Sequence, residues 1–281
     1  MNTFRIKSNA KINLALNIIG KKVNLHKIES IVSFIDLYDL IYLNQIEEKN
    51  HQISFKGKFS KNIQKKNSVS NLLKLLDQKN LLDKKKFKIK IVKNIPQKSG
   101  MGGGSMNAAS LINFFIKKKM LKLKKNEMTK ITNQIGSDVI LGINPSNTIL
   151  FSNNKIKKYK GNIKLHVLVV KPSFGCSTKY IYSKVKSFSK PQFSSSMQKM
   201  FSVKYLKNLN NDLEIIAFNK YPKLKRIKSF LLTTPNNKFV RMSGSGSSIV
   251  AYFYSKKACD NAYKQFKRKF NGVWCIKSKT I

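Results

Sequence analysis

The sequence contains only three cysteines, which excludes a disulfide framework as the basis of its stability. Cys176, Cys259 and Cys275 are far apart and form no CxxC pair. An odd number of separated cysteines favours free thiols in a reducing compartment. The three histidines are also too few and too scattered for a zinc site. We therefore predict no metal site built by the protein alone.

Long apolar runs are missing as well. No segment approaches the roughly 18 consecutive apolar residues that a membrane-spanning helix needs. The N-terminal segment has basic and apolar residues, but Asn9, Asn13 and Asn17 interrupt the apolar core of a signal peptide. We therefore expect a cytoplasmic protein with no membrane partner.

Acidic residues are scarce, since 12 Asp and Glu face 56 Lys and Arg and give a formal net charge of +44. Such a balance is typical of proteins that bind nucleic acid or anionic surfaces. Only four of the basic residues are arginine, however, and nucleic-acid readers favour the planar guanidinium group. Because lysine is spread over nearly every segment, the pattern favours a solvated lysine-rich surface. We predict no nucleic-acid partner.

The periodicity of the apolar residues predicts a mixture of strands and helices. With 281 residues, 41% of them hydrophobic, the chain can form one large or two ordinary domains. Strands are expected at 3–7, 11–19, 30–36, 40–46, 86–96, from about 164, around 241–254 and at 272–278. Helices are expected at 68–80, 105–120, 126–136, 198–208, 212–220, 222–232 and 256–270. These elements do not alternate regularly, which favours an α+β fold. Polar residues at 153–161 suggest a domain boundary, dividing the chain into 1–155 and 156–281.

Glycine is concentrated in one place, the segment IPQKSGMGGGSMNAAS at 95–110. Gly100, Gly102, Gly103 and Gly104 follow a predicted strand and precede a predicted helix. Bare backbone amides at a helix N-terminus form an anion site, and a phosphate chain is the obvious ligand. The alternative is a flexible turn, for which fewer glycines would suffice. No Lys follows the last glycine as a Walker A loop requires, and Ser105 replaces the last glycine of a GxGxxG pattern.

The segment resembles the phosphate loop P-x-x-x-G-L-G-G-G-S-S-N-A-A of the GHMP kinase superfamily. Five further segments narrow the resemblance to the 4-diphosphocytidyl-2-C-methyl-D-erythritol kinases. They are NAKINLALNIIGKK near the N-terminus, LHKIESIVSFIDLYDLI at 25–41, IGSDVILGI at 135–143, and the pair NDLE at 211–214 and MSGSGSSIVAYF at 242–253. The segments come in the family's order and span almost the whole chain.

The resemblance implies a two-domain GHMP-kinase fold with ATP and substrate in the cleft between the domains. Residues 1–155 would be the N-terminal ATP-binding domain and 156–281 the C-terminal domain. It implies transfer of a phosphoryl group from ATP, with Mg²⁺, to the 2-hydroxyl of 4-diphosphocytidyl-2-C-methyl-D-erythritol. This reaction belongs to the non-mevalonate route to isoprenoid precursors. A monomer or a weak homodimer is expected.

The resemblance also assigns roles to individual residues. Asp138 would orient and deprotonate the attacking hydroxyl, and Lys11 would lie beside it. His26 and Asn13 would recognise the cytosine end of the substrate, and Tyr182 would stack on the base. From the residues alone, Asp138 would be a cap or turn residue and His26 a structural or surface residue, and Tyr182 could equally pack in the core. The ATP phosphates would be bound by the loop, which consists of Pro96, Gln97, Lys98, Ser99, Gly100, Met101, Gly102, Gly103, Gly104, Ser105 and Met106.

The sequence departs from the family pattern at several positions. Leu25 replaces the usual Tyr before His26, so one side of the cytosine pocket is missing or supplied elsewhere. Met106 replaces the second loop Ser, and Ile140 replaces the usual Pro. Lys98 could contact a phosphate or face solvent. Two other functions stay open: another GHMP-type small-molecule kinase, acting on homoserine or a mevalonate-like substrate, and a basic nucleic-acid-binding protein.

Overall fold

The computed structural model describes residues 3–21, 23, 25–153, 155–159, 161, 163–193 and 198–281. The chain divides into two compact units. Unit 1 comprises Met1–Lys11, Leu37–Gln97 and Gly102–Pro145, and unit 2 comprises Ile12–Asp36, Lys98–Met101 and Ser146–Ile281. The units interleave along the chain. The division into family domains 1–155 and 156–281 stays a prediction.

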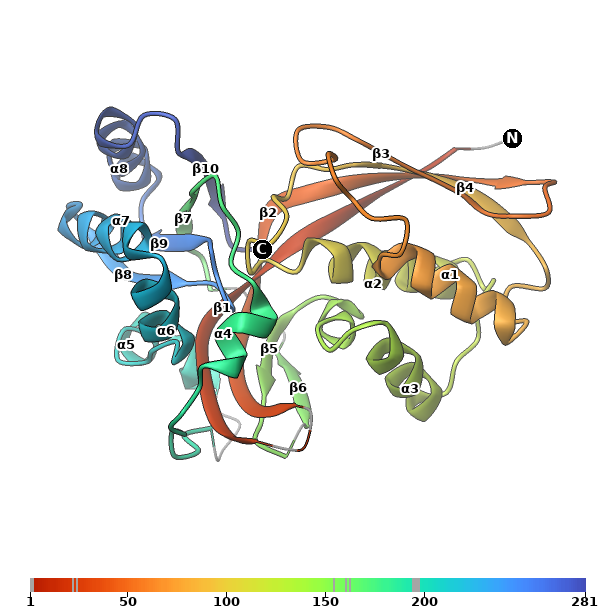
Figure 1. Ribbon diagram of the computed structural model, residues 1–281, viewed down its shortest axis with the longest axis horizontal. Helices are drawn as coiled ribbons and strands as arrows, with labels where there is room; N and C mark the ends of the chain where they lie inside the picture. The colour runs from red at the N-terminus through yellow and green to blue at the C-terminus, as the bar shows by residue number, and fades with distance from the viewer. Residues whose placement is uncertain are drawn as a thin grey trace. The chain divides into compact units, whose positions relative to one another are not determined.

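Two long strands open the chain and contribute residues to both units. β1 spans Phe4–Lys21 and β2 spans His26–Ile46, and they pair with each other (Figure 1). The sequence predicted four shorter strands here. The breaks predicted at 8–10 and 37–39 are wrong, whereas β1 and β2 are separate strands as predicted. The polar residues that interrupted the apolar pattern are buried within continuous strands. Asp39, for example, is fully buried and accepts hydrogen bonds from the Asn94 and Ile95 amides.

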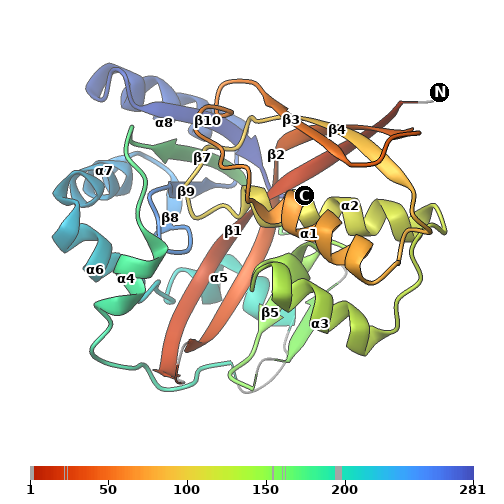
Figure 2. The same cartoon turned by 45° about the vertical axis from the view of Figure 1, so that its right-hand side comes forward.

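Unit 1 is a sheet covered by helices. β3 (Gln52–Lys56) runs parallel to β4 (Lys86–Val92), and β4 pairs antiparallel with the second half of β2. The helices α1 (Ser68–Gln78), α2 (Gly103–Lys117) and α3 (Lys125–Ile135) lie side by side, and the 3₁₀ helix η1 (Val139–Gly142) follows them (Figure 2). Apolar residues at helical spacing on α1 and α2 meet the alternating apolar residues of β4. The core of unit 1 includes Leu72, Leu76, Phe87, Ile89, Ile91 and Phe115.

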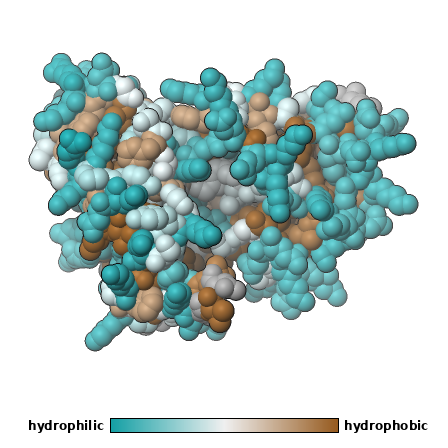
Figure 3. Space-filling view, in the orientation of Figure 1, coloured by the Kyte–Doolittle hydropathy of each residue, from teal (hydrophilic) through white to brown (hydrophobic). Residues whose placement is uncertain are grey.

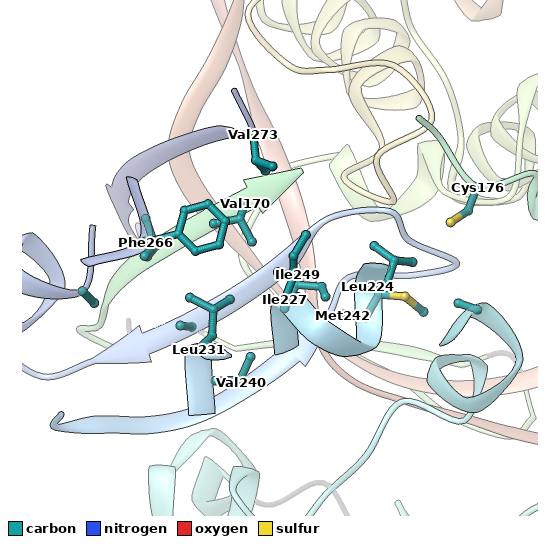
Figure 4. Packing of buried hydrophobic residues seen from close by; sticks show 14 of the residues in the cluster. Val170, Cys176, Leu224, Ile227, Leu231, Val240, Met242, Ile249, Phe266 and Val273 are labelled. Atoms are coloured by element: carbon teal, nitrogen blue, oxygen red, sulfur yellow. The ribbon is translucent and has the colours of Figure 1, made fainter. Parts of the chain in front are cut away.

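Unit 2 is built on a four-stranded antiparallel sheet in the order β10-β7-β9-β8. These strands are β7 (His166–Lys171), β8 (Asn237–Met242), β9 (Ile249–Phe253) and β10 (Trp274–Lys279). Helices α7 (Pro222–Thr233) and α8 (Lys256–Lys269) pack on it through the apolar side chains that Figure 4 shows, among them Leu224, Ile227, Leu231, Val240, Ile249 and Phe266. Each such fully buried side chain contributes about 2 kcal/mol through the hydrophobic effect.

The remaining elements of unit 2 are short. β5 (Asn147–Leu150) pairs with β2 at Ser30–Val32, and β6 (Ile156–Tyr159) pairs with β5. The others are α4 (Thr178–Ser183), η2 (Gln198–Phe201), α5 (Val203–Leu206) and α6 (Leu213–Lys220). The single helix predicted at 198–208 is wrong, because the segment forms η2 and α5 with Ser202 as the N-cap of α5.

The mixed antiparallel sheets and helices confirm the predicted α+β class. Strands β3, β5 and β6 and helix α4 were not predicted. Cys176, Cys259 and Cys275 are free thiols. In the part of the chain that the structure describes, no helix is both long and apolar enough to cross a bilayer. Hydrophilic side chains cover much of the face shown in Figure 3.

Candidate active site

In unit 1, Lys11 and Asp138 form an ion pair. Lys11 comes from β1 and Asp138 from the link between α3 and η1, and the Lys11 Nζ lies 3.2 Å from Asp138 Oδ2. The Lys11 side chain is 5% exposed and that of Asp138 is 37% exposed. Asp138 precedes η1 but makes no side-chain capping bond. The pair therefore presents a carboxylate, held by a buried ammonium, at an accessible position.

The first turn of α2 lies beside this pair. Gly102 has a φ of +66°, and a Cβ there would lie 3.0 Å from Lys11 Cγ. A Cβ on Gly136 would likewise lie 3.8 Å from Ser105 Oγ. The α2 N-terminus has no side-chain capping bond and no acidic residue in its first turn. No side chain therefore competes with an anion for the first backbone amides of α2, and phosphate binding there stays a prediction.

In unit 2, residues 98–101 lie on the serine loop, which we define as residues 243–248. The backbone amide of Ser247 donates to the Lys98 carbonyl at 3.3 Å, and that of Ser248 donates to the Ser99 carbonyl at 3.1 Å. Ser243 Oγ donates to the carbonyl of Gly100 at 2.9 Å. A Cβ at Gly100 would lie only 1.9 Å from the Ser243 carbonyl oxygen. The two loops therefore fit together only with glycine at position 100.

The NDLE segment holds the serine loop. Asn211 Nδ2 donates to the carbonyls of Met242 and Gly244, both at 2.8 Å. Glu214 Oε1 accepts the Met242 amide at 2.7 Å. These contacts give a structural reason for two motifs that lie about thirty residues apart and are both part of the family pattern.

The predicted substrate residues all lie in unit 2. The His26 and Tyr182 rings are 5.2 Å apart and tilted by 46°. Burial, with a smaller effect of Lys21, lowers the pKa of His26. Asn13 donates through its backbone amide to Ser243 Oγ at 3.2 Å and through Nδ2 to Ser30 Oγ at 2.8 Å. Leu25 is 69% exposed, so its side chain is not packed in the core.

Several side chains of the predicted ATP loop are used by the protein itself. Gln97 Nε2 donates to the carbonyls of Phe59 and Lys61, at 2.9 and 2.7 Å. Met101 and Met106 are buried. Contact of this loop with a phosphate chain would therefore come mainly from its backbone amides, together with Ser105 and the exposed Lys98.

The sequence did not predict the ion pair between Lys93 and Asp39, which fixes the residues just before the glycine loop in unit 1. Lys93 Nζ donates to Asp39 Oδ2, and both side chains are buried. Asp39 Oδ1 also accepts the amides of Asn94 and Ile95, at 2.8 and 2.9 Å. The signal in the sequence was an acidic residue inside an apolar strand, in a chain with only 12 acidic residues.

The described residues contain no group of three His, Cys, Asp or Glu side chains that could hold a metal ion. Mg²⁺ needs no such group, because it is commonly bound through one or two protein oxygens together with substrate phosphates. The Asp138 carboxylate and the Ser105 hydroxyl are oxygen donors of this kind near the first turn of α2. The residues present therefore fit a phosphate-bound Mg²⁺.

Comparisons with known proteins show the family of this chain. The family described as GHMP kinases N terminal domain matches residues 67–150. A 4-diphosphocytidyl-2-C-methyl-D-erythritol kinase of Pelagibacter ubique strain HTCC1062 is 68% identical over the full length of both chains. One of Clostridium tetani strain Massachusetts / E88 is 33% identical, covering 99% of this chain and all of that protein.

Solved structures share the fold. A crystal structure of 4-(cytidine 5'-diphospho)-2C-methyl-D-erythritol kinase aligns with a TM-score of 0.78 at 18% identity, over 99% of this chain and all of that one. Homoserine kinase from Cytophaga hutchinsonii aligns with a TM-score of 0.73 at 14% identity, over all of this chain and 95% of that one. Full-length identity of 68%, together with the loop and the ion pair described above, shows that this chain belongs to the 4-diphosphocytidyl-2-C-methyl-D-erythritol kinase family of GHMP kinases.

Proposed function

We propose that the protein uses ATP to phosphorylate the 2-hydroxyl of 4-diphosphocytidyl-2-C-methyl-D-erythritol, in the non-mevalonate route to isoprenoid precursors. The observation that carries the proposal is the Lys11–Asp138 ion pair beside the uncapped N-terminus of α2. Family membership supports the choice of substrate. We expect the enzyme to act in the cytoplasm as a monomer or weak homodimer. A cleft between the domains 1–155 and 156–281 would hold both substrates.

The chemistry assigns one task to each group. The amides of the glycine loop and the first turn of α2 bind the ATP phosphates, because a helix N-terminus stabilises negative charge. Asp138 accepts a hydrogen bond from the attacking hydroxyl and takes its proton as the new P–O bond forms; the bond from the γ-phosphorus to the bridging oxygen breaks, and ADP leaves with that oxygen. Lys11 keeps the carboxylate in place and stabilises charge on the transferred phosphoryl group. Positioning and charge stabilisation are what phosphoryl transfer chiefly requires.

Mg²⁺ would bind through ATP phosphate oxygens, with Ser105 Oγ as a nearby protein donor. When bound, it neutralises charge on the phosphates. The protein contributes the bare backbone that lets the phosphates approach and the hydroxyl that faces them.

On the substrate side, His26 and Tyr182 form the aromatic pair that would hold the cytosine ring, and Asn13 would lie alongside. Burial lowers the pKa of His26, so a neutral ring is favoured near pH 7, and a neutral imidazole can both donate and accept a hydrogen bond. Leu25 stands where the family has Tyr, so the other side of the cytosine pocket would be missing or supplied elsewhere.

The test is an assay of purified protein with ATP, Mg²⁺ and each of three acceptors: 4-diphosphocytidyl-2-C-methyl-D-erythritol, homoserine and mevalonate. Homoserine is included because a homoserine kinase shares the fold. We expect ADP release with the first acceptor only, and phosphorus NMR should place the new phosphate on the 2-hydroxyl. Turnover of homoserine or mevalonate instead would assign the other kinase function. No turnover with any of the three would overturn the proposal.

A further inference from the structure

Lys171 is a buried cation that the proposed reaction does not use. It is the last residue of β7 and is 7% exposed. Its Nζ donates to the carbonyls of Pro172 at 2.9 Å and Phe174 at 3.0 Å. Burial lowers its pKa, and the nearby Cys176 thiol opposes this shift. Among the described residues, no carboxylate pairs with Lys171. Burying an ammonium group against neutral carbonyls alone is costly, so a role for this cation is expected.

The turn that Lys171 holds, residues 172–175, contacts the glycine loop. A Cβ at Gly175 would lie 2.4 Å from Lys98 Cβ and 3.0 Å from the Lys98 carbonyl oxygen, so the two backbones are in direct contact. The Gly175 φ is not in the left-handed region. Position 175 therefore requires glycine because the Lys98 backbone lies so close, and not because of the backbone conformation of Gly175.

The same turn contacts the serine loop. The Phe174 carbonyl that Lys171 binds also accepts Ser247 Oγ at 2.9 Å. Thr178 Oγ1 lies 2.9 Å from Ser245 Oγ. Cys176 is buried, and a Cβ at Gly246 would lie 3.2 Å from its Sγ. Three segments distant in sequence, 98–101, 172–178 and 243–248, therefore support one another within unit 2.

We propose that Lys171 is a positioning residue for ATP: its ammonium pulls the Pro172 and Phe174 carbonyls together and thereby seats Gly175 against the 98–101 part of the glycine loop. The proposal rests on the proposed function, because it assumes that this loop binds the ATP phosphates. Without the ammonium, the buried Pro172 carbonyl loses its donor and the Phe174 carbonyl keeps only Ser247 Oγ, so the turn relaxes away from Lys98. The loop amides are then less well preorganised for the phosphates, which weakens ATP binding.

The principal variant is Lys171→Met, which keeps the chain length and removes the charge and the donors. We expect the KM for ATP to rise on the order of tenfold, as for a small displacement of a positioning group, with a smaller change in the KM for the cytidine substrate. Lys171→Arg, which can still donate to both carbonyls, should recover much of the ATP affinity. Lys257→Met on the exposed side of α8 is the matched control and should behave as wild type.

A second variant distinguishes loss of the contact with Lys98 from a general loss of folding. Gly175→Ala leaves Lys171 intact but places a methyl group against Lys98, so it should raise the KM for ATP in the same way. The double variant should be clearly less than additive, because both changes act through one contact. Thermal melting accompanies each measurement.

The outcomes separate the two proposals. If the wild type does not phosphorylate the cytidine substrate, the proposed function fails, and calorimetric titration with ADP tests the Lys171 proposal on its own. If the wild type is active and Lys171→Met keeps its KM for ATP, the Lys171 proposal is wrong. It is also wrong if the variant only melts at lower temperature with unchanged kinetics, or if Lys171→Arg gives no recovery.

Discussion

Asp138 has the most specific expected chemistry of any single residue in this protein. Asp138→Asn keeps the shape of the side chain but removes its charge and its capacity to take a proton. We expect kcat to fall by about 10²–10⁴-fold, the range typical of a lost general base, with little change in thermal stability. Steady-state kinetics and circular dichroism measure the two effects.

The control for Asp138→Asn is Asp83→Asn, since Asp83 forms only an exposed ion pair with Lys85 at 3.8 Å. This variant should keep wild-type kinetics. If Asp138→Asn also turned over at a near-normal rate, Asp138 would have no catalytic role.

Gly100 tests the packing of the glycine loop on the serine loop. In Gly100→Ala, the new methyl group would lie 1.9 Å from the Ser243 carbonyl oxygen, at a φ of +75°. We expect ATP binding to weaken by at least about tenfold, because the loop must move to relieve the clash. Isothermal titration with ADP is the measurement.

Gly272→Ala is the matched control, because Gly272 has a φ of +84° but nothing within 4 Å of its Cβ position. It carries the same backbone strain without the clash and should bind ADP normally. Equal losses in the two variants would mean that backbone strain, and not the contact with Ser243, is responsible.

The sequence predicted a residue of the candidate site only where that residue belongs to a family motif. Asp138 and Lys11 are 127 residues apart in the sequence, and nothing in their own surroundings indicates that they meet. The family resemblance predicted that the two residues lie side by side, and the structure shows their 3.2 Å contact. Lys171 and Gly175 belong to none of the family motifs, so the sequence could not predict their contacts, which only the structure shows.

At the scale of elements, His51 joins β3, β4 and α1. Its Nδ1 accepts the Phe87 amide at 3.0 Å, so the proton of the neutral ring is on Nε2, which lies 3.2 Å from Asp77 Oδ1. Asp77 also pairs with Lys86 at 2.7 Å. Protonation of His51 would place a second hydrogen against the Phe87 amide. Burial also disfavours the charged ring and lowers the pKa of His51 in the folded state, although Asp77 opposes the shift.

The lowered pKa makes stability depend on pH. Above pH 6.5 the ring is neutral in both states, and the contribution of His51 to folding is complete. As the pH falls below 6.5, the unfolded chain binds a proton before the folded one does, so stability decreases. We expect urea midpoints to fall between pH 7.5 and 5.5, and to fall less in His51→Asn, which cannot titrate. Parallel curves for the two proteins would exclude His51 as the cause.

Regular elements were predicted well where periodicity was strong and poorly where length or context decided. The helices at 68–78 and 256–269 have clear amphipathic spacing and N-caps at Asn67 and Ser255. The continuity of β1 and β2 could not be predicted, because buried polar residues in them, such as Asn13 and Asp39, bond to partners that are distant in sequence. β5 and β6 are only four residues long, too short for any periodicity to show.

At the scale of the whole molecule, the net charge of +44 should affect substrate capture more than the chemical step. Both proposed substrates are anions, and a positive surface attracts them over a distance that salt shortens. We expect kcat/KM to fall several-fold between 50 and 500 mM potassium chloride, whereas kcat changes little. Stopped-time assays at saturating and at low substrate concentration separate the two constants.

A flat response of kcat/KM to salt would show that the lysine surface does not steer the substrates. A parallel filter-binding measurement with unrelated DNA distinguishes a general affinity for polyanions. Tight binding at physiological salt would favour the nucleic-acid function, and we expect none.

The interleaving of the two units has a consequence for biosynthesis. Unit 1 ends at Pro145, so all of it has been synthesised when barely half of the chain has left the ribosome. Residues 12–36 leave the ribosome among the first, but some of their partners are synthesised much later. Leu16 bridges to Asn211, and the Ile18 amide donates to the Asp212 carboxylate. The nascent chain therefore carries the early β1–β2 pair, whose residues 12–36 lack some of their partners until translation is nearly finished, since Ile35 bridges to Thr280.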